Sequence, residues 1–170
     1  MIRRKEALLN AALVNPFLAS TIDLFEKTFG ITPRVGEVYL DERARTHRWD
    51  VSAVMVLTGS AIGVVAVRLT RLLADKLLHK SGVLWATEEE RLSLCDGMVG
   101  ELVNVIAGNA SGNLAGYDIE ISVPLVIQGA NHTVSWPDRA PVLSIPFSTE
   151  LGPFMVNVSL IEIPKAYRKA

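Results

Sequence analysis

The most apolar stretch of this chain restricts its possible folds more than any other feature. It runs for seventeen residues, from Val51 to Val67, without a charged side chain. A membrane-spanning helix needs about 20 apolar residues, and Gly59 and Gly63 have the spacing of closely packed membrane helices. However, Thr58-Gly59-Ser60 separates two runs rich in valine and isoleucine, which is typical of a β-hairpin. We therefore expect two largely buried, paired strands here.

Composition excludes several classes of protein. The chain has 170 residues, of which 49% are hydrophobic and 21% charged, with a net charge of −1. This hydrophobicity excludes intrinsic disorder, and the absence of a basic excess argues against nucleic-acid binding. A single cysteine, Cys95, excludes an internal disulfide framework and a cysteine-rich metal site. Glu6 and Asn10 interrupt the apolar region that a signal peptide would need, so we expect a cytoplasmic protein.

The remaining patterns predict an α+β fold in one domain over residues 1–170, with a mostly antiparallel sheet covered by helices. Thr87 and Glu90 have the spacing of a capping box, which predicts a long helix from Glu88 to Ala110. We also expect helices over about Asn15–Phe29 and Thr70–Lys80. Expected strands are Pro33–Leu40, Trp49–Leu57, Ile62–Arg68, Ile119–Ile127, Val142–Phe147 and Phe154–Ile163, with a solvated loop at Asp41–Arg48.

The long helix has two distinct rows of residues. The first is apolar and is expected to face the core; it consists of Leu92, Cys95, Val99, Leu102, Ile106 and Ala110. Cys95 lies in this row and is therefore interpreted as a structural thiol. The second row consists of Gly97, Glu101, Asn104 and Gly108.

Glycine is costly within a helix. Gly97, Gly100 and Gly108 together lower the stability of the helix by roughly 2–3 kcal/mol relative to alanine. Two explanations remain open: close packing of the chain against this side of the helix, or contact with a partner protein that reaches Glu101 and Asn104 between the glycines. These two side chains are three residues apart and so share one helix face. Together they could bind a cation and orient a water molecule.

The residues around this pair resemble a known family. The segment from Gly100 to Ala110, GELVNVIAGNA, is similar to the signature helix of the CheX-type chemotaxis phosphatases, in the CheC/CheX/FliY superfamily. Weaker similarities lie in the first helix (Asn15–Glu26), in the Leu57–Gly63 hairpin, and in the pair Val142–Phe147 with Leu151–Phe154. The resemblance covers about residues 15–161. Val105 departs from it, since many relatives have methionine there.

The resemblance implies a function. Members of this family remove the phosphoryl group from the phospho-aspartate of CheY-like response regulators. Glu101 and Asn104 match the family's active pair: Asn104 would hold a water in line with the phosphorus, and Glu101 would pair with the regulator's conserved lysine. No cofactor of its own is implied, because the Mg²⁺ would belong to the regulator, and no metal site is expected in this chain.

The resemblance also bears on assembly. CheC-type relatives usually have two Glu-x-x-Asn pairs, whereas this chain has one. It is therefore similar to the single-site CheX type, which is associated with homodimers formed through the sheet. Asn109 matches the signature too, but we interpret it as structural, because asparagine near a helix end often binds backbone groups.

Two other functions remain open. The same fold could bind a regulator or a flagellar-switch-like partner without hydrolysis, or it could be a structural subunit of a sensory complex. His47, His79 and His132 are scattered through the sequence without a second ligand at metal spacing, so we interpret them as surface or capping residues.

Overall fold

The computed structural model describes residues 2–40, 49–130, 132–137 and 140–167. Its helices within these residues are α1 (Ile2–Phe29), α2 (Arg71–Lys80), α3 (Glu88–Gly112) and the short 3₁₀ helix η1 (Lys165–Tyr167). Its strands are β1 (Arg34–Val35), β2 (Tyr39–Leu40), β3 (Val51–Gly59), β4 (Ala61–Leu69), β5 (Ile119–Ile121), β6 (Leu125–Gln128), β7 (Leu143–Thr149) and β8 (Gly152–Glu162).

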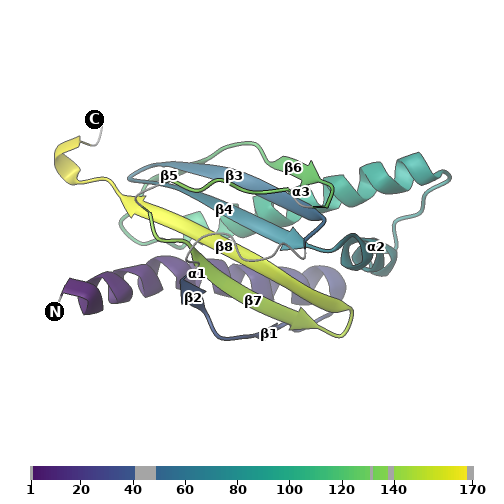
Figure 1. The fold of residues 1–170 in the computed structure, drawn as a ribbon, viewed down its shortest axis with the longest axis horizontal. Helices are drawn as coiled ribbons and strands as arrows, with labels where there is room; N and C mark the ends of the chain where they lie inside the picture. The colour runs from purple at the N-terminus through teal and green to yellow at the C-terminus, as the bar shows by residue number, and fades with distance from the viewer. Residues whose placement is uncertain (1, 41–48, 131, 138–139, 168–170) are drawn as a thin grey trace.

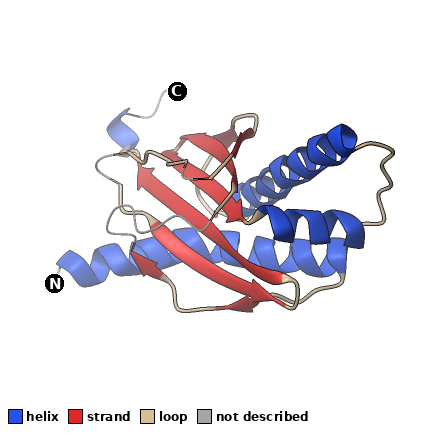
Figure 2. Ribbon diagram, turned by 45° about the vertical axis from the view of Figure 1, so that its right-hand side comes forward, coloured by secondary structure: helices blue, strands red, loops and turns tan. Residues whose placement is uncertain are grey.

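The strands form one sheet in the order β1-β7-β8-β4-β3-β5, while β2 also pairs with β7 and β6 with β3. Each of these pairs is antiparallel. α1 and α3 lie on one face of this sheet, as Figures 1 and 2 show from two directions. The predicted α+β fold, a mostly antiparallel sheet covered by helices, is confirmed.

The apolar stretch forms the predicted hairpin. β3 and β4 pair from Val51 with Leu69 to Leu57 with Gly63. Side chains alternate between the two faces, so that Met55 is fully buried under the helices whereas its neighbour Val56 is 44% exposed. No helix in the described part of the chain is both long and apolar enough to span a bilayer.

Both glycines of this hairpin lie where the backbone of another segment comes very close. A Cβ atom at Gly59 would be 2.2 Å from the carbonyl oxygen of Asp118, and one at Gly63 would be 2.0 Å from that of Ser159. Gly59 also has a positive φ of 107°, a backbone conformation that residues other than glycine rarely adopt. The glycine spacing that resembled a membrane-helix motif therefore permits close strand contacts.

α2 and α3 begin at threonine caps. The side chain of Thr70 accepts a hydrogen bond from the N–H of Leu73, and that of Thr87 accepts one from the N–H of Glu90. The second half of the predicted capping box is different, because the Glu90 carboxylate accepts from the N–H of Ala86, at 2.8 Å, one residue before the cap. The start of α3 is nevertheless where the sequence places it.

Two helices are longer than predicted. α1 begins at Ile2 instead of near Asn15, so Pro16 lies inside the helix and not in its first turn. α3 continues past Ala110 to Gly112. Its end is held by Asn113, whose N–H donates to the carbonyl of Ala110 and whose side chain donates to that of Asn109.

Two predicted strands are each divided in the structure. The region 33–40 contains only β1 and β2, and the region 119–127 contains β5 and β6, which residues 122–124 separate. At the turn between them, β7 continues past its predicted end at Phe147 and β8 begins before its predicted start at Phe154, because their pairing continues to Thr149 with Gly152. The predicted loop Asp41–Arg48 lies outside the described residues.

Aromatic stacking connects α1 to the sheet. Phe154 of β8 stacks between Phe25 of α1, at 4.4 Å between ring centroids, and Phe147 of β7, at 4.9 Å. All three rings are at most 2% exposed. α1 also packs along α3. The stack therefore holds against the sheet a helix that α3 contacts.

Candidate functional site

α3 positions the candidate site through its buried side. Cys95, Val99 and Ile106 are fully buried between this helix and the sheet, as predicted. Leu92 is 37% exposed, so its prediction as a core residue is wrong. The reason is that the first turns of α3 extend past the end of the sheet (Figure 1).

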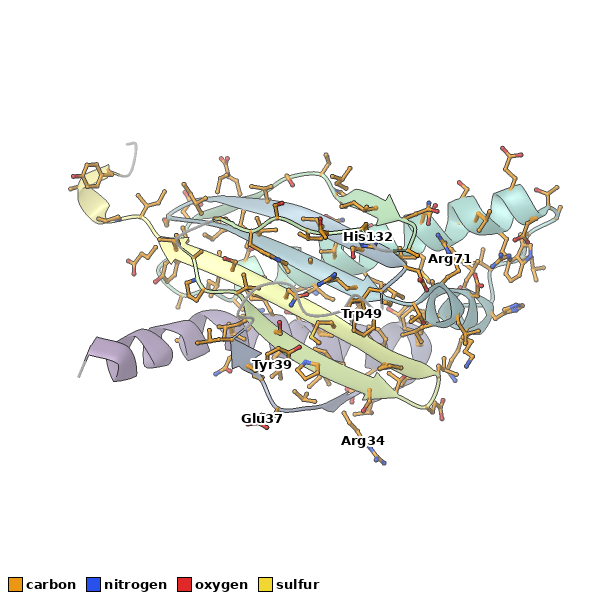
Figure 3. The ribbon with its side chains drawn as sticks, viewed as in Figure 1. Arg34, Glu37, Tyr39, Trp49, Arg71 and His132 are labelled. Atoms are coloured by element: carbon orange, nitrogen blue, oxygen red, sulfur yellow. The ribbon has the colours of Figure 1, made fainter. Side chains whose placement is uncertain are left out.

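A polar network around Arg71 holds α3 to α2 and β6. Its guanidinium donates to Oδ1 of Asp96 on α3, at 3.1 Å, and to Oε1 of Gln128 on β6, at 2.7 Å. The side chain of Gln128 also binds Asp96, and the backbone N–H of Arg71 donates to Asp50. Figure 3 shows Arg71 where α2 begins. Sequence reasoning missed this network, because its members are far apart along the chain.

The single cysteine is part of a second anchor. Its thiol donates to Oδ1 of Asp75 on α2 at 3.1 Å, and Arg91 also pairs with Asp75. Burial, and after it the hydrogen bond to Asp75, raise the pKa of the Cys95 thiol to about 11. The thiol therefore stays protonated near neutral pH, which confirms its interpretation as a structural residue.

Glu101 and Asn104 lie together on the side of α3 that is turned away from the sheet. Glu101 is exposed and Asn104 half-buried. Nδ2 of Asn104 donates to Oε2 of Glu101 at 3.3 Å. Among the described residues, Oδ1 of Asn104 and Oε1 of Glu101 have no hydrogen-bond partner. The amide oxygen can thus accept from a water and the carboxylate can bind a cation; their catalytic roles remain predictions.

The three glycines of α3 have different surroundings. A Cβ atom at Gly97 would meet nothing within 4 Å, so no neighbouring residue accounts for this glycine. Gly100 is buried beneath β6, where a Cβ would be 3.3 Å from Val126. Internal packing explains Gly100, and the prediction that it contacts a partner is therefore not supported. Gly108 is half-buried, and a Cβ there would make an ordinary contact with Ile121.

The segment between β5 and β6 forms a rim along α3. Ile121 lies beside Gly108 and Pro124 beside Gly100, so the residues between them pass the level of Asn104. Ser122 fixes this segment, since its N–H and Oγ bind the carbonyl and the N–H of Val56, each at 2.9 Å. Val123 follows, and its side chain is 85% exposed.

An apolar groove lies on the α1 side of the pair. Its volume is about 520 Å³, and Glu101 is its single charged lining residue. The other lining residues come from α1, from the end of α2 with the loop after it, and from α3: Leu24, Thr28, Phe29, Leu78, Ser81, Val83, Ser93, Leu94, Gly97, Met98, Leu102 and Val105. We call it the α1–α3 groove.

Asn109 lies outside both the Glu101–Asn104 pair and the α1–α3 groove. It is exposed and faces Ser20 and Asp23 of α1 across a polar hollow. Its side chain makes no hydrogen bond within the described residues, and Asn113 is the residue that binds backbone groups at the end of α3. The structural role predicted for Asn109 therefore belongs to Asn113.

A serine and a histidine also meet on the face of the sheet opposite the helices. Nε2 of His132, which Figure 3 labels, lies 2.6 Å from Oγ of Ser52, and its Nδ1 lies 2.7 Å from the carbonyl oxygen of Gly129. Ser52 is fully buried and His132 half-buried, so this pair attaches the segment after β6 to the sheet, with the serine hydroxyl closed to a substrate. Within the described ranges, no three acidic, histidine or cysteine side chains are grouped as a metal site would require.

Comparisons with known proteins agree on one family. The family model described as "Chemotaxis phosphatase CheX" matches residues 51–148, which include Glu101 and Asn104. No curated protein matches the chain.

Solved structures are similar over most of the chain. A CheX from Desulfovibrio desulfuricans is 30% identical with a TM-score of 0.76, and covers 88% of this chain and 99% of its own. A putative chemotaxis protein from Desulfovibrio vulgaris Hildenborough is 32% identical with a TM-score of 0.78, and covers 88% and 96%. CheX of Borrelia burgdorferi, in a complex with CheY, BeF₃ and Mg²⁺, has the same fold at 23% identity and a TM-score of 0.75, and covers 88% and 97%.

Proposed function

Because the chain belongs to the CheX family of chemotaxis phosphatases, we propose that it hydrolyses the phospho-aspartate of a CheY-like response regulator. The observation that carries the proposal is the Glu101–Asn104 pair, which points outward from a firmly anchored helix. The regulator as partner is supported by the Borrelia relative, which was crystallised with CheY.

The two side chains suit hydrolysis without a protein nucleophile. Water attacks the phosphorus, the bond between phosphorus and the aspartate oxygen breaks, and the products are inorganic phosphate and the free carboxylate. Phosphoryl transfer depends mainly on positioning and electrostatics. Oδ1 of Asn104 accepts a hydrogen bond from the attacking water and aligns it. Glu101 pairs with the regulator's lysine and so fixes the orientation of the complex. The regulator supplies the Mg²⁺.

The test is the lifetime of the phosphorylated regulator. A candidate regulator is phosphorylated with a small phosphodonor, and phosphate loss is followed with wild type, Asn104→Ala and Glu101→Ala. The added rate is the rate of phosphate loss above that of the regulator alone. We expect Asn104→Ala to lower this added rate at least about 100-fold, because a positioning group is lost from the transition state. Asn109→Ala is the matched control and should leave the rate unchanged.

Other outcomes distinguish the alternatives. If Asn104→Ala leaves the added rate unchanged, the water-positioning role is wrong. If wild type binds the activated regulator but leaves its phosphate lifetime unaltered, the protein is a binding module of the same fold.

A homodimer through the sheet is also part of the proposal. The face opposite the helices exposes Val56, Ile62 and Ile161 at 44%, 50% and 39%, and the last two are directly paired on β4 and β8. Such apolar surface favours contact with a second copy. Light scattering should give twice the chain mass, and Ile62→Asp should lower it; a monomeric wild type at micromolar concentration would contradict the dimer.

A further inference from the structure

The α1–α3 groove is an apolar hollow beside the candidate site, and the hydrolysis itself does not use it. It continues directly from Glu101, which lines the groove and also belongs to the Glu101–Asn104 pair. Because Glu101 belongs to both, a macromolecule that contacts the pair also reaches the edge of this groove.

The chemistry of the lining defines what can enter. Leu94, Met98 and Val105 give α3 an apolar wall, and Leu24 faces them from α1. The one charge, on Glu101, lies among them, so the complementary surface is an apolar side chain close to a cation. A regulator surface with an apolar residue near its active-site lysine has both features.

We infer that the α1–α3 groove determines partner specificity by binding an apolar side chain of the response regulator next to the lysine that pairs with Glu101. This inference rests on the proposed function, because the lysine and its pairing with Glu101 belong to that proposal. It assigns the groove a role separate from chemistry: the side chain in the groove contributes equally to the bound state and to the transition state.

Gly97 offers a direct test. It lines the groove, and a Cβ there meets nothing within 4 Å, so Gly97→Leu places an apolar side chain into the groove from an open position. Thr28→Leu fills it from the opposite wall, and Thr28 is exposed, so that folding does not depend on it. Gly112→Leu makes the same glycine-to-leucine change at an open position of α3 outside the groove.

We expect Gly97→Leu and Thr28→Leu to raise the KM for phosphorylated regulator about 10- to 100-fold, the effect of excluding one leucine-sized side chain, with kcat nearly unchanged. Gly112→Leu should leave both constants at the wild-type values. Circular dichroism and thermal melting verify that each variant folds. If both groove variants fold and bind the regulator as tightly as wild type, the inference is overturned.

Binding of beryllofluoride-activated regulator, followed by titration, separates this inference from the proposed function. If wild type binds without hydrolysing and the groove variants lose binding, the groove assignment is upheld while the phosphatase proposal fails. If wild type does not bind the regulator, the inference is overturned. A change in the chain's own oligomeric mass in Gly97→Leu, with regulator binding intact, would identify a second copy as the occupant and also overturn it.

Discussion

Replacing Gly63 with alanine should severely weaken the sheet. A Cβ atom there would lie 2.0 Å from the carbonyl oxygen of Ser159 and 2.6 Å from a methyl carbon of Leu160, both on β8. An ordinary contact between such atoms is about 3.4 Å, so β4 and β8 would have to separate by about 1.4 Å at this point. Gly63 is directly paired with Leu160 in the continuous β4–β8 ladder, so this movement breaks the hydrogen bonds around the pair.

The expected cost follows from that movement. Two backbone hydrogen bonds contribute roughly 1 kcal/mol each, and forcing extra volume into a packed site costs about 1–3 kcal/mol. We therefore expect Gly63→Ala to lower the free energy of unfolding by about 3–5 kcal/mol, and Tm by about 6–20 °C.

Urea denaturation followed by circular dichroism measures this difference, and Gly97→Ala is the matched control. Alanine at Gly97 meets no neighbour, so the better helix former should raise the free energy of unfolding by about 0.8–1 kcal/mol. A loss of less than 1 kcal/mol for Gly63→Ala would refute the argument that close strand approach requires this glycine.

Three further predictions test the anchoring of α3. Thr87→Ala removes the cap that binds the N–H of Glu90 and should lower the free energy of unfolding by about 1 kcal/mol, measured by urea denaturation. Arg71→Ala leaves Asp96 without its guanidinium partner and should cost about 1–3 kcal/mol, with Arg71→Lys recovering only part because lysine cannot bind two partners in the same geometry. Cys95 should react slowly with iodoacetamide at pH 8 and rapidly in urea, since its pKa is raised to about 11 in the folded protein; alkylation at equal rates in both states would contradict its burial.

Local patterns in the sequence were sufficient for several elements. The hairpin follows from two valine-rich runs around Thr58-Gly59-Ser60, and the start of α3 follows from Thr87, because each depends on residues close together in the chain. The proximity of Glu101 and Asn104 follows from the helix period alone.

Features that depend on distant segments could not be predicted in this way. Gly100 is a glycine because Val126 packs closely against it, and Arg71 is held by hydrogen bonds to Asp96 and Gln128. No local sequence pattern connects these residues. The groove requires α1, α2 and α3 to meet, so its existence depends on the folded arrangement. The start of α1 was misplaced for another reason: Pro16 is common in a first helical turn, but here it lies within a helix that packs along α3.

The position of β8 has a consequence for biosynthesis. This strand is the last of the sheet along the chain, yet it lies between β4 and β7, near the middle of the strand order. Residues up to Glu162 must therefore have left the ribosome before β8 can pair with both β4 and β7. Translation proceeds at about 5–20 residues per second, so the β4 edge of the apolar β3–β4 hairpin stays unpaired for several seconds. During translation, that unpaired edge can pair with another chain, and a chaperone that covers it would prevent such aggregation.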